Sequence, residues 1–98
     1  MKLEFRRGHS LSVETLRQRI DARVADYTTR YPKYDVGSLY RWTSATTAEG
    51  SYRGADGKIS FDAANIGVEL HLPFFARPFK GKIEDFLQRE FEAITRAA

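Results

Sequence analysis

The spacing of apolar residues changes twice along this chain, and that change limits the fold more than any other feature. Between residues 13 and 31, apolar side chains recur every three or four positions, which predicts one long amphipathic helix. Between residues 38 and 72 they alternate with polar ones, which is typical of half-buried strands. Helical spacing returns from Ile83 to Ile94, and residues 2–6 alternate as a short strand. The predicted order is β-α-β-β-β-β-α, an α+β fold.

Local signals predict where both helices begin and where the first one ends. Ser12 is the expected N-cap of the first helix, Glu14 adds negative charge to its first turn, and Pro32 ends it. Gly81 is the expected N-cap of the second helix, with Glu84 three residues later.

Three turns divide the alternating region into four strands. The clearest is Asp56-Gly57, because this dipeptide suits the positive φ angles of a two-residue type I′ hairpin. A second two-residue loop is predicted at Ala64-Asn65, and a three-residue loop at Ser44-Ala45-Thr46. The resulting cross-strand pairs on the apolar side are Tyr52 with Phe61, Gly54 with Ile59, Phe61 with Val68, Ile59 with Leu70, and Tyr40 with Gly50.

These pairings give the predicted antiparallel sheet one apolar and one polar face. Two amphipathic helices can cover only one face, so we expect both on the apolar side and the other face open to solvent. The first strand is expected antiparallel beside residues 66–72, because this position leaves fewer exposed edges. The residues expected on the open face are Arg41, Arg53, Lys58, Ser60, Asp62, Glu69 and His71.

Length and composition limit the class of protein. The chain has 98 residues, 42% hydrophobic and 30% charged, which fits one compact domain over residues 1–98. The absence of cysteine removes disulfides, thiolate nucleophiles and zinc fingers, and it is compatible with a reducing compartment. The chain start has no apolar core of signal-peptide length, and no stretch approaches the roughly 20 apolar residues of a membrane span. We therefore expect a cytoplasmic protein.

The sequence offers little for enzymatic chemistry. Ser10 adjoins His9, but adjacent side chains seldom hydrogen-bond productively, and no Gly-x-Ser-x-Gly context exposes a serine. The two histidines, His9 and His71, lie far apart in the chain, so we expect no metal site and no cofactor. Asp62 and Glu69 could form an acid–base group with His71, but a solvated cross-strand ladder explains them better. We expect no enzyme activity.

Nucleic-acid binding by a sheet face requires exposed aromatic side chains on which bases stack. In the predicted register, the aromatic strand residues Tyr40, Trp42, Tyr52 and Phe61 all face the helices. The open face then carries charges of alternating sign and no stacking platform, which weakens a phosphate track. With a net charge of only +3, we do not expect a nucleic-acid partner.

Residues 73–82 form the most unusual segment, with three phenylalanines, two prolines and three cations. The prolines argue against a helix or a central strand, so we expect a connecting loop. The phenylalanines could fill the end of the core, which a short chain favours because it needs every large apolar group. Alternatively, the loop inserts apolar groups into an interface and holds charge at its edge. The candidate contact residues are Phe74, Phe75, Arg77, Phe79, Lys80 and Lys82.

This segment also carries a family resemblance. Residues 70–84, above all Pro78-Phe79-Lys80-Gly81-Lys82-Ile83-Glu84, together with residues 9–12 and 52–59, resemble the polyhydroxyalkanoic acid system family of bacterial proteins. The likeness runs from about Phe5 to Ile94, with departures in the longer connection at residues 34–37 and the turn at residues 43–47. The resemblance implies a short protein encoded near polyhydroxyalkanoate synthesis or granule genes, and it brings no catalytic residues with it.

The resemblance and the residue pattern lead to one expectation and three alternatives. We expect a small non-enzymatic protein on polyhydroxyalkanoate granules or their protein coat, with residues 73–82 as its contact segment. The first alternative is a homodimeric adaptor to a synthase or phasin, which would use the open sheet face or an edge strand. Another is an acyl-ester enzyme or a carrier of small apolar ligands, with a cavity near Gly50 and Gly54 that we expect side chains to fill instead. Nucleic-acid binding is the third.

Overall fold

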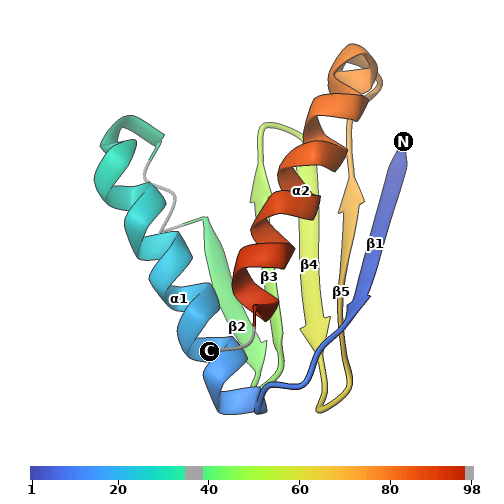
Figure 1. Cartoon of the computed structure of the whole chain (residues 1–98). Coiled ribbons are helices and arrows are strands. Elements are labelled where there is room, and N and C mark those ends of the chain that lie inside the picture. Colours follow the sequence, from blue (N-terminus) through green and yellow to red (C-terminus); the bar gives the residue numbers. More distant parts are fainter. Residues whose placement is uncertain (35–38, 97–98) are drawn as a thin grey trace.

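The computed structural model describes residues 1–34 and 39–96, and its elements follow the predicted order (Figure 1). The connection at residues 35–37, expected to be longer than in the family, lies outside the described residues. The elements are β1 (Lys2–Gly8), α1 (Val13–Arg30), η1 (Pro32–Tyr34), β2 (Tyr40–Ser44), β3 (Thr47–Tyr52), β4 (Ala55–Phe61), β5 (Asn65–His71), η3 (Phe74–Phe79) and α2 (Lys80–Thr95).

The five strands form one antiparallel sheet in the order β1-β5-β4-β3-β2. The first strand pairs with β5 from Lys2↔His71 to Gly8↔Asn65, which confirms its predicted place at that edge. Both helices lie against the same face of the sheet (Figure 1). The core between them is a cluster of buried side chains from both helices, β4 and β5, namely Leu16, Ile20, Phe61, Ile66, Val68, Phe91 and Ile94.

The first helix begins and ends where the sequence predicts. The Ser12 hydroxyl accepts a hydrogen bond from the Thr15 amide at 3.1 Å, the contact expected of an N-cap. At the other end Tyr31 is the C-cap, and Pro32 follows it directly. Asp21 ties this helix to β2, because its carboxylate accepts hydrogen bonds from the Tyr40 hydroxyl at 2.6 Å and the Trp42 indole at 2.9 Å.

The predicted start of the second helix is wrong by two residues. Phe79 occupies the N-cap position without a side-chain hydrogen bond, and Gly81 lies inside α2. A side-chain cap is dispensable here because η3 runs directly into α2. The Lys80 amide donates to the Arg77 carbonyl, so one of the otherwise unpaired N–H groups at the helix start already has a partner.

The predicted hairpin at Asp56-Gly57 is also wrong. The β3–β4 turn is made by Arg53 and Gly54, which have φ angles of 48° and 83°, and Tyr52 pairs with Ala55. Both turn residues therefore adopt the left-handed conformation that a tight two-residue hairpin requires. Gly57 instead lies within β4, where a methyl group would come 3.0 Å from Leu70 Cδ2.

The β4–β5 loop is longer than predicted, and Phe61 pairs with Ile66 rather than Val68. The two strands join through the three residues 62–64, and Asp62 holds this loop: its carboxylate accepts from the Ala64 and Asn65 amides at 2.8 and 2.7 Å. The predicted Tyr40↔Gly50 pair is confirmed, with a bulge between Trp42 and Ser44. The observed β3–β4 and β4–β5 registers each differ from the predicted ones by an even number of residues. Every strand residue therefore keeps its predicted face of the sheet.

Candidate functional site

Residues 74–79 form a short 3₁₀ helix, η3, so the expectation of a connecting loop without helix is wrong. Pro73 is its N-cap, and the Ala76 amide donates to the Pro73 carbonyl at 3.0 Å. Pro78 lies inside η3. A proline can occupy this position because the i→i+3 bonds in a short 3₁₀ helix run from Ala76 and Lys80, and neither needs an N–H at Pro78.

The three phenylalanines of this segment point away from the core. Phe74 is 84% exposed, Phe75 63% and Phe79 55%. Phe74 and Phe75 contact each other edge to face, with ring centroids 6.1 Å apart. The interpretation that these side chains fill the end of the core is therefore wrong, because α2 already covers the sheet with Phe91 and Ile94.

The elements that carry the other exposed apolar side chains reach the same end of the molecule (Figure 1). This end carries η3, the start of α2, the end of α1, the β3–β4 turn and the N-terminus (Figure 1). Two contacts join the residues that lead into η3 to the β3–β4 turn and to the N-terminus: Pro73 lies beside Gly54, and the Leu72 amide donates to the Met1 carbonyl at 2.7 Å. We call this surface the aromatic end, and define it by the exposed side chains Tyr31, Tyr52, Phe74, Phe75, Phe79 and Phe86.

Sequence reasoning missed Tyr31, Tyr52 and Phe86 as parts of this surface. Their spacing assigns all three to core faces. In the structure they are nevertheless 41–48% exposed. Together with Met1, the six residues of the aromatic end are all the large apolar side chains that are exposed within residues 1–34 and 39–96. No local signal in the sequence could have shown that they gather at one end.

Cations surround the aromatic end. Arg77, Lys80 and Lys82 are exposed beside the phenylalanines, and Lys80 lies 3.8 Å from Glu84 one helical turn away. Two further guanidinium groups lie over tyrosine rings: Arg53 at 5.3 Å from the Tyr52 centroid, and Arg30 at 4.8 and 5.9 Å from those of Tyr27 and Tyr31. The arrangement is an apolar surface with a basic rim.

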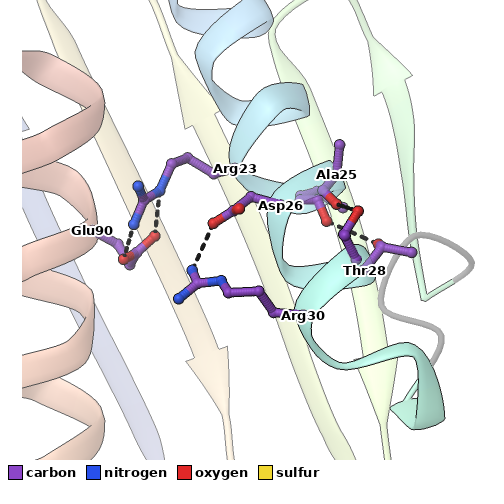
Figure 2. A network of polar contacts seen from close by, with 8 residues as sticks. Arg23, Ala25, Asp26, Thr28, Arg30 and Glu90 are labelled. Carbon is purple, nitrogen blue, oxygen red and sulfur yellow. Dashed lines mark hydrogen bonds and ion pairs between the residues drawn. The ribbon is translucent and has the colours of Figure 1, made fainter.

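One ion pair joins the two helices below this end (Figure 2). Arg23 of α1 donates two hydrogen bonds to the Glu90 carboxylate of α2, at 2.9 and 2.5 Å. Burial of the Glu90 carboxyl opposes its ionisation, but the hydrogen bonds from Arg23 and Tyr27 outweigh it and hold the pKa of Glu90 below its usual range. The hydrogen bond from Tyr27 to Glu90 positions the Tyr27 ring, which lies 5.9 Å from that of Phe86.

This ion pair makes the stability of the fold dependent on pH. Because the pKa of Glu90 is lower in the folded than in the unfolded chain, its contribution is present above the usual glutamate pKa of about 4.3 and is lost as the pH falls through the folded value. We expect Glu90→Gln to be less stable than wild type at pH 7 and the difference to shrink below about pH 4. Urea unfolding across this pH range measures it, and a constant difference would contradict the assignment.

The open sheet face is a ladder of charges, as predicted for Arg41, Lys58, Glu69 and His71. Arg41 pairs with Glu49, which pairs with Lys58, and Lys58 pairs with Glu69. Arg53 does not belong to this face, because it lies in the β3–β4 turn; its predicted place is wrong for the same reason as the predicted turn. Ser60 lies in β4 near the ladder and Asp62 in the β4–β5 loop.

An apolar cleft of about 330 Å³ lies between the two helices and the sheet. The expectation that side chains fill this space is therefore wrong. Gly50 lines the cleft as considered from the sequence, but Gly54 does not; the second glycine is its cross-strand partner Gly57. Neither α1 nor α2 is long and apolar enough to cross a membrane, and the same holds for every helix within the described ranges.

Comparison with known proteins identifies one family. The family described as "Putative polyhydroxyalkanoic acid system protein" matches residues 3–94, which includes β2 to β5, α1 and η3, and all but one residue each of β1 and α2. No curated protein and no solved structure matches the chain. Since the match covers almost the whole sequence, the chain belongs to the polyhydroxyalkanoic acid system family.

Proposed function

We propose that this protein is a non-enzymatic component of the polyhydroxyalkanoate system that binds the granule surface through its aromatic end. The observation that carries the proposal is that Phe74, Phe75 and Phe79 are all exposed within one short segment at one end of the fold. Exposed apolar groups that gather in one patch mark an interaction surface far more often than single scattered ones do. Membership of the family supplies the polymer as the partner of matching chemistry.

The energetics favour an apolar surface as the partner. Phe74, Phe75 and Phe79 keep most of their surface in water in the free protein. Removing one phenylalanine side chain from water is worth about 1.5–3 kcal/mol, so two or three acting together support stable attachment. The basic rim formed by Arg77, Lys80 and Lys82 would meet anionic groups at the granule boundary, as basic residues do at lipid interfaces.

Sedimentation with purified granules tests the proposal. Phe74→Ser combined with Phe75→Ser is expected to lower the bound fraction at least about tenfold, because each lost ring removes about 1.5–3 kcal/mol of burial. The matched control is Arg41→Ser with Lys58→Ser, which changes two exposed residues of the open face and leaves the aromatic end intact. A thermal melt followed by circular dichroism verifies that both variants fold.

Each outcome bears on the mode of binding. Loss of sedimentation in the phenylalanine variant alone supports attachment through the aromatic end. Undiminished sedimentation of that variant would overturn the proposal. Binding to native granules but not to protein-stripped polymer particles would show that the partner is a protein of the granule coat. Loss of sedimentation in the open-face control would direct attention to the adaptor alternative.

A further inference from the structure

The cleft between the helices and the sheet has an apolar interior. Its walls are aliphatic side chains from both helices and the sheet, among them Ile20, Val24, Leu70 and Leu87. Four polar strand residues also border the cleft, namely Glu49, Ser51, Asp56 and Lys58. They occupy the alternate positions of β3 and β4, and all four also line the groove on the opposite face of the sheet. Their side chains therefore point to the open face, and only their backbone borders the cleft.

Part of the floor of the cleft is backbone, with Leu70 close to Gly57 and the Leu39 carbonyl close to Gly50. Gly50 and Gly57 are cross-strand partners on adjacent strands, so two facing positions carry no side chain. The peptide groups here are paired in the β-ladder, and among the described residues no buried side-chain nitrogen or oxygen lacks a hydrogen-bond partner. A ligand inside the cleft would find no polar group that lacks a hydrogen-bond partner. This favours hydrocarbon over a sugar or a nucleotide.

The dimensions suit a single extended chain. Residues of four neighbouring strands, β2 to β5, line the cleft, and neighbouring strands lie about 4.8 Å apart, so it reaches across about 14 Å. A ligand with a chain that extends over this distance contacts all four strands, which a short chain cannot do.

A cation lies at one end of the cleft. Tyr52 is a lining residue and is 41% exposed, so it marks a place where the cleft meets solvent. The Arg53 guanidinium lies 5.3 Å from the centroid of the Tyr52 ring. A carboxylate on a chain that enters the cleft there would meet this charge at the rim.

We propose that the cleft binds the alkyl chain of a linear fatty acid of medium length, with its carboxylate at Arg53. This site is separate from the exposed phenylalanines of the aromatic end, and the inference does not depend on granule binding. The ligand is a free carboxylic acid, so an ester or an alcohol with the same chain should bind more weakly. Butyrate is too short to span the cleft and should bind more weakly as well.

Isothermal titration calorimetry with decanoate tests the site. We expect one decanoate per chain, and at least tenfold weaker binding in Val24→Phe, which fills the cleft from α1. The matched control is Ala25→Phe, which adds the same ring to the neighbouring exposed residue of α1 and should bind as wild type. Ala55→Leu fills the cleft from β4 and serves as a second variant if Val24→Phe does not fold.

Two comparisons make the test specific. Arg53→Asn, which keeps a residue that tolerates positive φ, should weaken binding of decanoate but leave that of decanol unchanged. Val24→Phe should sediment with granules as wild type does, while the phenylalanine double variant should still bind decanoate. The inference would be overturned if the wild-type protein showed no saturable binding of decanoate, or if Val24→Phe and Ala55→Leu both bound decanoate as tightly as wild type. Either result would leave the granule proposal untouched.

Discussion

Replacing Phe91 with alanine is expected to lower the free energy of unfolding by about 3–5 kcal/mol, the largest effect of any single phenylalanine in the chain. The Phe91 ring is only 2% exposed, and its centroid lies 5.2 Å from that of Phe5. Alanine would leave a cavity between α2 and the sheet that the strands cannot close. Urea unfolding at neutral pH measures the change.

Phe75→Ala is the matched control for Phe91→Ala. Its ring is 63% exposed, so the same truncation should change the free energy of unfolding by less than about 0.5 kcal/mol. The pair separates an apolar residue that stabilises the fold from one that is available to a partner. A loss of several kcal/mol in Phe75→Ala would show that this segment packs in solution and would contradict the aromatic end as a binding surface.

Gly50→Ala is expected to lower the free energy of unfolding by about 2–3 kcal/mol. A methyl group at Gly50 would lie 2.6 Å from the carbonyl oxygen of Leu39, which also accepts a hydrogen bond from the Ser51 amide at 3.3 Å. The neighbouring atom belongs to the backbone, so relief of the clash requires movement of the chain at Leu39, directly before β2. The cleft would also change shape, since Leu39 and Gly50 both line it.

Gly81→Ala provides the matched control for Gly50→Ala. Nothing lies within 4 Å of a methyl group at Gly81, and this residue lies in the first turn of α2. Alanine should therefore raise the free energy of unfolding by up to about 1 kcal/mol, because it restricts the unfolded chain and favours the helix. Chemical unfolding of both variants measures the contrast. If Gly50→Ala and wild type had the same free energy of unfolding, the chain at Leu39 would be able to move away from the methyl group at no cost, which would contradict the prediction.

Periodicity predicted the elements and their faces, and local errors left that result intact. The turn was placed at Asp56-Gly57 instead of Arg53-Gly54, yet Ile59 and Phe61 still face the helices. The reason is that side chains alternate with a period of two, so a shift by an even number of residues keeps each residue on its side. The choice between two glycine-containing turns depends on what packs elsewhere: Leu70 covers Gly57, and Pro73 lies beside Gly54.

By itself the sequence determined the α+β order, the core residues of both helices, the capping by Ser12 and the candidate contact segment at residues 73–82. These follow from local spacing and local hydrogen bonding, which a sequence expresses directly. Only the tertiary structure decided that Phe74 and Phe75 are exposed, that Tyr31, Tyr52 and Phe86 are exposed as well, and that a cleft lies between the helices and the sheet. Exposure and empty space depend on packing between residues far apart in the chain, which local spacing does not express.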